Sequence, residues 1–362
     1  MEDKREYNID IFRILATFFV VALHVLKHGG ILEGLGYISI SYVVAWGIEL
    51  CTVCAVNCYG LISGYVGLNS RHKLQGIIRL WFDVFFYSFV IYVVMTLLFA
   101  RPFSINEFIS YIFPITSYKY WYFSCYFIVF FLGEGLSKVV NNLEKNKVKL
   151  LLIVLFLFFS LIPTVLNQDI FWTINGNGVL WLLYLYLVGA YFKKYGFKFL
   201  KSLNSIILYF IFVIVGGLIR SILAVMALQD HAYFNVGLQW NNYTSPLVFG
   251  CAICLLAFFA NTKFKMTDKM KKIVLLLSSS SFGIYLIHDH PLVRELLITR
   301  KFKYLTLMPV LKMTLMIFIS IIGIYSICLL IDVIKKKLLK VLNIEKIINK
   351  VENSINSVVE KV

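Results

Sequence analysis

The sequence contains few charged residues for its length. Asp, Glu, Lys and Arg make up 15% of its 362 residues, against about 25% in soluble domains, and 60% of the residues are hydrophobic. A soluble fold of this length could not bury so much apolar surface. The composition therefore excludes a soluble protein and predicts one that lies in a lipid bilayer.

The sequence also lacks the features of a secreted protein. Its seven cysteines lie in or beside apolar runs, which does not fit a disulfide framework. The first apolar run has no small-residue cleavage site, so we expect it to be retained. Cys51, Cys54 and Cys58 fall on one helical face, a spacing that also suits a metal. Since no histidine with ligand spacing accompanies them, we favour packing between helices and expect no metal.

Apolar runs long enough to cross a bilayer recur along the whole chain. They predict an all-α fold, a polytopic transmembrane bundle of about ten helices. The runs lie at 9–27, 41–66, 77–99, 121–140, 149–166, 178–193, 204–227, 245–261, 273–290 and 309–334.

Basic residues outnumber acidic ones by 35 to 19, and their positions test this division. When the loops between the runs are numbered alternately, 25 basic residues fall on one side and 8 on the other, with Arg13 and Arg220 inside helices. Because loops rich in Lys and Arg face the cytoplasm, both termini are expected there. The basic surplus then reflects topology, and no nucleic-acid partner is expected.

Two loops and the C-terminal segment stand apart from the apolar runs. The loops at 167–177 and 228–243 contain no Lys or Arg but carry amides and aromatic rings. This composition suits sugar binding and equally suits an aromatic belt at the membrane interface. Residues 335–362 follow the membrane domain of 1–334 and have the spacing of an amphipathic helix, which would lie on the inner leaflet or pair with a partner.

Ionisable groups inside a membrane are costly, so each is a candidate for function. In the first run, Asp10 can neutralise Arg13 one helical turn away. Arg13 and His24 share a helical face and lie about 16 Å apart along its axis. A cation near the cytosol could hold an anionic ligand while the histidine handles protons. The alternative is that Arg13 is a topological anchor and His24 an interfacial residue.

Two further clusters are ambiguous in the sequence. Gly60 and Gly64 allow close helix packing, and the intervening Ser63 could contact a ligand. The segment from His288 to His290 encloses Asp289 in a His-Asp-His pattern that could bind metal. We favour hydrogen bonding for this pattern.

Five segments together resemble the motifs of the integral-membrane acyltransferase-3 family. The first is a basic residue and a histidine separated by ten residues, Arg13 and His24. Residues 59–64 keep the last two residues of the motif Phe-Phe-x-x-Ser-Gly, and Arg79 matches the second arginine of Arg-x-x-Arg. Residues 119–123 form an aromatic helix entry, and 281–288 are similar to Ser-x-Gly-Ile-Tyr-Leu-x-His. The resemblance runs from about residue 8 to residue 334. It implies ten helices, with both termini in the cytoplasm, in a bacterial cytoplasmic membrane.

The resemblance also implies an activity. Members of the family transfer an acyl group, usually acetyl, from cytosolic acyl-coenzyme A to a hydroxyl of a glycan or another envelope molecule. The expected donor here is acetyl-coenzyme A, and the expected acceptor is a glycan, free or lipid-linked. The oligomeric state is left open, with a homo-oligomer as one option.

The same analogy assigns roles to residues. His24 would be the general base or a transient acyl carrier, and Arg13 and Asp10 of the same helix would belong to the catalytic set. The donor would be bound at its phosphates by Arg13 and Arg79, with Arg71 and Lys73, and along its channel by Ser63 and Gly64. We expect four more residues to contact substrate: Trp121, Tyr122, Arg220 and His288.

Two other functions remain compatible with the sequence. One is a transporter, either a polysaccharide exporter or an amino-acid permease of the same membrane fold. The other is a non-catalytic assembly factor, for which the C-terminal segment is the specific support.

Overall fold

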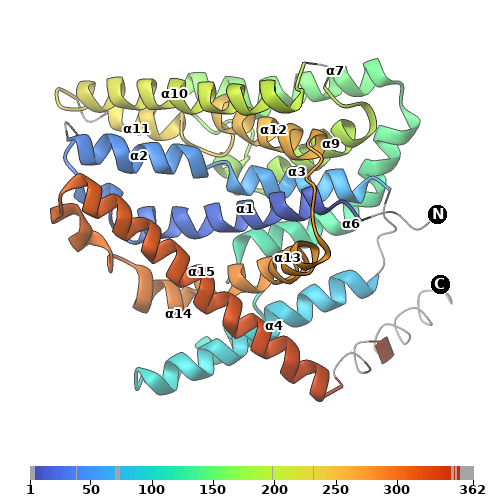
Figure 1. Cartoon of the computed structure of the whole chain (residues 1–362), viewed down its shortest axis with the longest axis vertical. Coiled ribbons are helices and arrows are strands. Elements are labelled where there is room, and N and C mark those ends of the chain that lie inside the picture. The colour runs from blue at the N-terminus through green and yellow to red at the C-terminus, as the bar shows by residue number, and fades with distance from the viewer. Residues whose placement is uncertain are drawn as a thin grey trace.

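The fold was obtained as a computed structural model, which describes residues 5–37, 39–69, 74–197, 199–230, 232–343, 346, 349 and 350. Within these residues the chain is helical and contains no strand, which confirms the all-α prediction (Figure 1). The helices are α1 (Tyr7–Leu23), α2 (Ile40–Thr52), α3 (Ala55–Gly67), α4 (Leu74–Leu98), α5 (Ile105–Ile112), α6 (Trp121–Asn142), α7 (Lys145–Phe156), α8 (Ile162–Leu166), α9 (Val179–Tyr195), α10 (Ser202–Met226), α11 (Ala232–Gln239), α12 (Pro246–Asn261), α13 (Asp268–His288), α14 (Pro291–Val293) and α15 (Val310–Val341).

Eight helical stretches in the described part of the chain are long and apolar enough to cross a membrane. They are Tyr7–Gly34, Ile40–Gly67, Gly76–Leu98, Trp121–Asn142, Lys145–Leu166, Ser202–Met226, Asp268–His288 and Val310–Val341. The two other expected spans correspond to α9, with 17 residues, and α12, with 16. The structure thus shows a multi-pass helical protein, and the count of ten stays a prediction.

Three of the expected spans are not uniform α-helices. The run at 41–66 is two helices, because the chain turns at Val53 and Cys54 between α2 and α3. The first run passes from α1 into a π-helix over His24–His28. A second π-helix, Leu157–Leu161, separates α7 from α8 just before Pro163, which has no backbone N–H to donate. Such π segments occur often at functional sites.

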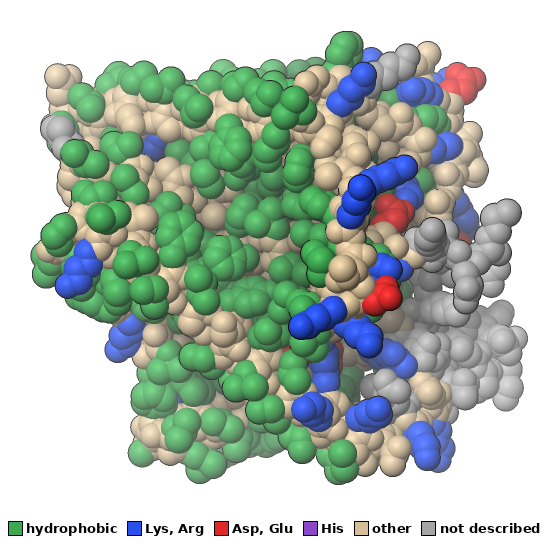
Figure 2. All heavy atoms as spheres, viewed as in Figure 1, with side chains coloured by type: hydrophobic (Ala, Val, Ile, Leu, Met, Phe, Trp, Pro, Cys, Tyr) green, Lys and Arg blue, Asp and Glu red, His purple; other side chains and the backbone are tan. Residues whose placement is uncertain are grey.

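The N-terminal residues and the helix ends that the sequence assigned to the basic side lie close together. Glu6 accepts a hydrogen bond of 2.9 Å from the Tyr65 hydroxyl at the end of α3 and pairs with Lys193 at the end of α9. Asn8 donates to the Thr262 carbonyl after α12, at 2.6 Å. Figure 2 shows Lys and Arg gathered at this end of the molecule, with hydrophobic side chains over the middle. The alternation of loops therefore agrees with the charge division, and the cytoplasmic assignment of this side stays a prediction.

Close approach of α3 and α9 forms the centre of the bundle. A Cβ added at Gly64 would lie 1.8 Å from the Tyr186 carbonyl oxygen, and one at Gly189 would lie 2.1 Å from the Leu61 carbonyl oxygen. Only glycine permits backbones to come this near. The predicted role of Gly64 in helix packing is therefore confirmed.

The cysteines of the α2–α3 region belong to this core. Cys54 and Cys58 are buried, with their Sγ atoms 4.0 Å apart, among apolar side chains. Across the described residues, no group of three or more His, Cys, Asp or Glu side chains is arranged to hold a metal ion.

The last helix is anchored by a buried ionic cluster. Lys335 pairs with Asp83 of α4, while Asp332 accepts a hydrogen bond of 2.7 Å from the Tyr87 hydroxyl. A Cβ at Gly283 of α13 would lie 2.0 Å from Asp332 Oδ1, so glycine is required there. The helix continues past residue 334 to Val341, and Lys335 is buried. The remainder of the predicted amphipathic segment falls mostly outside the described residues.

Candidate active site

A cavity of about 680 Å³ opens among α1, α3, α4, α6 and α13. We call it the inner cavity because it contains Arg13, near the basic end of α1. Its polar lining consists mainly of hydroxyl groups and two guanidinium groups. These polar residues include Arg13, Thr17, Tyr59, Ser63, Arg79, Tyr122, Tyr126, Ser278, Ser279, Ser281 and Tyr285.

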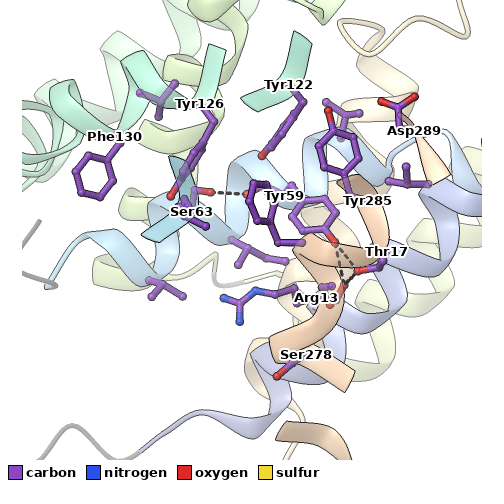
Figure 3. A pocket seen from close by; sticks show the side chains of 18 of the residues that line it. Arg13, Thr17, Tyr59, Ser63, Tyr122, Tyr126, Phe130, Ser278, Tyr285 and Asp289 are labelled. Carbon is purple, nitrogen blue, oxygen red and sulfur yellow. Dashed lines mark hydrogen bonds between the residues drawn. The ribbon is translucent and has the colours of Figure 1, made fainter. Parts of the chain in front are cut away.

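Hydrogen bonds to backbone carbonyls orient the inner wall. The Thr17 hydroxyl donates to the Arg13 carbonyl at 2.8 Å and is hydrogen-bonded to the Tyr59 hydroxyl. Ser63 donates to the Tyr59 carbonyl at 2.8 Å. Figure 3 shows Arg13 towards one end of this cavity and Asp289 at the other. The wall thus runs from a cation to a carboxylate.

A second cavity, of about 460 Å³, lies beyond Asp289. We call it the outer cavity. It is lined by amides, carboxyls and aromatic rings in place of hydroxyls. Its members include Lys27, His28, Glu33, Trp46, Glu49, Asn175, Asn177, Phe234, Asn241, Asn242 and Arg294.

The two cavities share part of their walls. Leu23, His24, Trp121, Tyr243 and Asp289 line both of them. A group bound in either cavity can therefore reach the His24 imidazole. This residue lies where α1 becomes a π-helix, and its carbonyl accepts the Gly29 N–H at 2.9 Å, five residues on.

Asp289 lies beside the His24 ring. Its Oδ1 atom is 3.7 Å from His24 Nδ1 and accepts a hydrogen bond of 2.7 Å from Arg294. The His288 ring packs 4.9 Å from the His24 ring, between centroids. A carboxylate placed near Nδ1 stabilises the imidazolium that forms when Nε2 takes up a proton. Arg294 fixes that carboxylate in position.

The two amide-rich loops meet at Tyr243. A Cβ at Gly176, whose φ is +92°, would lie 2.4 Å from the Tyr243 Cβ, so glycine admits this contact. Asn57 of α3 donates to the Tyr243 carbonyl at 2.8 Å. Burial, together with the charges of Glu49 and Asp289, raises the pKa of the Tyr243 hydroxyl. Tyr243 therefore stays protonated at neutral pH.

The family model described as an acyltransferase domain matches residues 6–331 of the chain. The chain belongs to the acyltransferase-3 family. Comparisons with curated proteins and with solved structures gave no match. The protein is thus a multi-pass membrane acyltransferase that lies in a lipid bilayer.

Five of the residues expected in the acyltransferase site line the cavities together with His24. Arg13, Ser63, Arg79 and Tyr122 face the inner cavity, and Trp121 faces both. The prediction that Arg13 and His24 share a helical face agrees with their common cavity.

Other expected residues lie outside the lining. Asp10 is buried and pairs with Arg13, at 3.1 Å, and with Arg5. Gly64 faces α9 and therefore contacts a helix, whereas we expected a donor channel. Arg71 and Lys73 fall outside the described residues, so their predicted phosphate contacts stay predictions.

Arg220 and His288 are also absent from the lining of both cavities. The Arg220 guanidinium stacks on Trp46, 3.8 Å from the ring centroid, behind the wall of the outer cavity. His288 is fully buried, and its Nδ1 atom is hydrogen-bonded to the Ile284 carbonyl at 2.6 Å. Both therefore support residues that line a cavity.

The residues of the His-Asp-His segment have different partners. His290 Nδ1 accepts the Leu292 N–H at 3.2 Å, so Nε2 carries the proton and donates to the Ser88 carbonyl at 3.1 Å. This is the hydrogen bonding we favoured for the pattern. We did not expect Asp289 to lie beside His24; its position next to two histidines was the only signal in the sequence.

Residues of the two loops fall in different surroundings, and the choice between sugar binding and an interfacial belt stays a prediction. Asn175 and Asn177 from the first, with Asn241 and Asn242 from the second, line the outer cavity. In contrast, Trp172 is 83% exposed, as a residue of an interfacial belt would be.

Proposed function

We propose that this acyltransferase moves an acetyl group from cytosolic acetyl-coenzyme A to a hydroxyl of a cell-surface glycan, in the bacterial cytoplasmic membrane. The observation that carries the proposal is the position of His24 on the wall shared by two chemically different cavities. A donor entering from the basic side and an acceptor entering from the opposite side would meet at this imidazole.

The inner cavity suits the donor. Guanidinium groups form charge-assisted hydrogen bonds with phosphate oxygens, and Arg13 and Arg79 lie in its wall. Apolar residues such as Val20, Ile62 and Val129 offer contact to a flexible chain that leads from the phosphates to the thioester.

His24 and Asp289 would act as a proton-transfer pair. The acceptor hydroxyl gives its proton to His24 Nε2 as its oxygen bonds to the thioester carbonyl carbon. The carbon–sulfur bond then breaks, and the proton passes from His24 to the sulfur, which leaves as free coenzyme A. The nearby Asp289 carboxylate supports the positive charge on the imidazole between these steps.

Substitution of His24 tests this assignment. In purified protein in lipid nanodiscs, we expect His24→Ala to lower the rate of acetyl transfer by about 10²-fold or more, because proton transfer is lost. The measurements are coenzyme A release and NMR detection of acetyl on the glycan. Asn142→Ala, at an exposed position of α6, is the control for folding. Normal transfer by His24→Ala would exclude this mechanism.

Transport was the alternative left by the sequence. It gains no support from the family match, since that match concerns acyl transfer. Coenzyme A release that depends on an added acceptor is expected of a transferase and is not required of a transporter.

A further inference from the structure

The outer cavity contains a carboxyl group that the proposed chemistry does not use. Glu49 of α2 lines this cavity and is only 4% exposed, and its Oε2 atom is buried without a hydrogen-bond partner. A buried carboxylate loses its hydration and needs hydrogen-bond donors to replace it. Donors to Glu49 are therefore expected from a molecule in the cavity.

The other carboxyls of the cavity differ from Glu49 in this respect. Asp289 is paired with Arg294 at 2.7 Å, and Glu33 with Arg300 at 3.0 Å. Among the described residues, Glu49 forms no ion pair within 4.0 Å. Lys27 and Arg294 also line the cavity, and Arg294 is already paired with Asp289. Glu49 is thus available to a ligand.

An aromatic surface adjoins this carboxyl. Trp46 lies one helical turn before Glu49, and both line the outer cavity. Arg220 stacks behind Trp46, and its Cζ is also 4.6 Å from the centroid of Phe234. A guanidinium stacked on an aromatic ring holds the ring in a fixed orientation. The wall therefore presents a rigid flat surface beside a hydrogen-bond acceptor.

The opposite wall supplies further polar and aromatic groups. The Oδ1 atom of Asn241 is buried without a hydrogen-bond partner. Trp121 and Tyr243 stack with their ring centroids 6.3 Å apart and face both cavities. A ligand with hydroxyl groups around the edge of an apolar ring would fit this arrangement. Amides and carboxyls bind the hydroxyls of such a ligand, and aromatic rings pack against its C–H face.

We infer that the outer cavity binds a sugar ring of the acceptor, with Glu49 accepting hydrogen bonds from its hydroxyls and Trp46 packing against its apolar face. The ring then presents one remaining hydroxyl to His24. This inference rests on the proposed function and adds to it the subsite and the residues that select the acceptor.

The test uses the full-length protein in nanodiscs with acetyl-coenzyme A as donor. The acceptor probes are the methyl pyranosides of glucose, galactose, mannose and N-acetylglucosamine, with sorbitol as an open-chain polyol. Coenzyme A release and mass spectrometry of the acetylated product give kcat and the KM of each substrate. Glu49→Gln keeps the size of the side chain and replaces one acceptor oxygen with an amide N–H donor. Glu107→Gln is the matched control, at a carboxyl of α5 outside both cavities that pairs with Arg101.

We expect at least one pyranoside to be acetylated and sorbitol not to be. For that pyranoside, Glu49→Gln should raise KM by about ten- to a hundredfold, because an amide N–H replaces a buried acceptor oxygen and leaves a sugar hydroxyl without its partner. The KM for acetyl-coenzyme A should change by less than about twofold. Such a split would not arise from general loss of folding.

The other outcomes contradict, in turn, the role of Glu49, the binding of a ring and the proposed function. If a pyranoside is acetylated and its KM is unchanged in Glu49→Gln, the assignment of Glu49 is wrong and the proposed function stands. Equal acetylation of sorbitol would overturn the binding of a ring. If no acceptor stimulates coenzyme A release from the unmodified protein, the proposed function fails, and this inference fails with it.

Discussion

The inner and outer cavities are separated by one wall yet differ in chemistry. Hydroxyl groups and the cations of Arg13 and Arg79 line the inner cavity, whereas the outer one combines amides, carboxyls and tryptophans with the cations of Lys27 and Arg294. Cationic groups favour an anionic ligand, and amides beside aromatic rings favour a neutral polyhydroxylated one. This difference in lining supports the proposal that the two cavities bind different substrates.

Their common wall explains why the two regions form one site. His24 and Asp289 belong to both cavities, so substitutions there should affect the reaction of both substrates. Substitutions elsewhere should affect one side alone. Three further predictions test this division, in decreasing order of expected effect.

Asp289→Asn should act on the common step. We expect kcat to fall by about 10²- to 10⁴-fold, because the imidazolium at His24 loses its carboxylate, with little change in the KM of either substrate. Steady-state coenzyme A release measures this. Asp268→Asn, at an exposed carboxyl of α13, should behave as the unmodified protein. A large change in one KM with normal kcat would instead make Asp289 a binding residue.

Arg79→Gln should affect the donor side alone. We expect the KM for acetyl-coenzyme A to rise by about ten- to a hundredfold through loss of a charge-assisted hydrogen bond, while the acceptor KM is unchanged. Two-substrate kinetics give both values. Lys138→Gln, which alters an exposed cation of α6 outside both cavities, is the control. Equal effects on both KM values would contradict the separation of the cavities.

Asn241→Ala should affect the acceptor side, and more weakly. Losing a neutral hydrogen bond should raise the acceptor KM by about two- to tenfold and leave the donor KM unchanged. The same two-substrate kinetics apply, with Asn142→Ala as the control. A donor-side effect of Asn241→Ala would place the donor in the outer cavity.

Periodicity in the sequence predicted much of the fold and one half of the site. Apolar length marks helices that cross a membrane, and 100° per residue places Arg13 and His24 on one face. The break at Val53 and Cys54 was missed because neither residue is a Gly or Pro that would end a helix. The local sequence does not distinguish a long helix from two short ones here.

Tertiary contacts account for the remaining differences. Asp289 reaches His24 only because α13 packs along α1, a contact between distant segments that periodicity does not reveal. Gly64 was assigned to a ligand channel by the family resemblance, and Arg220 was expected to contact substrate. In the structure a neighbouring backbone occupies the space beside Gly64, and Trp46 stacks on the Arg220 guanidinium. The sequence identified these residues, but it did not show which groups they pack against.

The contact between Gly176 and Tyr243 has a consequence for protein engineering. Since Gly176 of the first loop has no side chain and so permits the close approach of Tyr243 in the second, the two loops fit each other as a pair. Transplanting one of them from a relative would break that fit, whereas exchanging 167–177 together with 228–243 would preserve it. If the outer cavity binds the acceptor as proposed, retargeting of the enzyme is best attempted with both loops in a single graft.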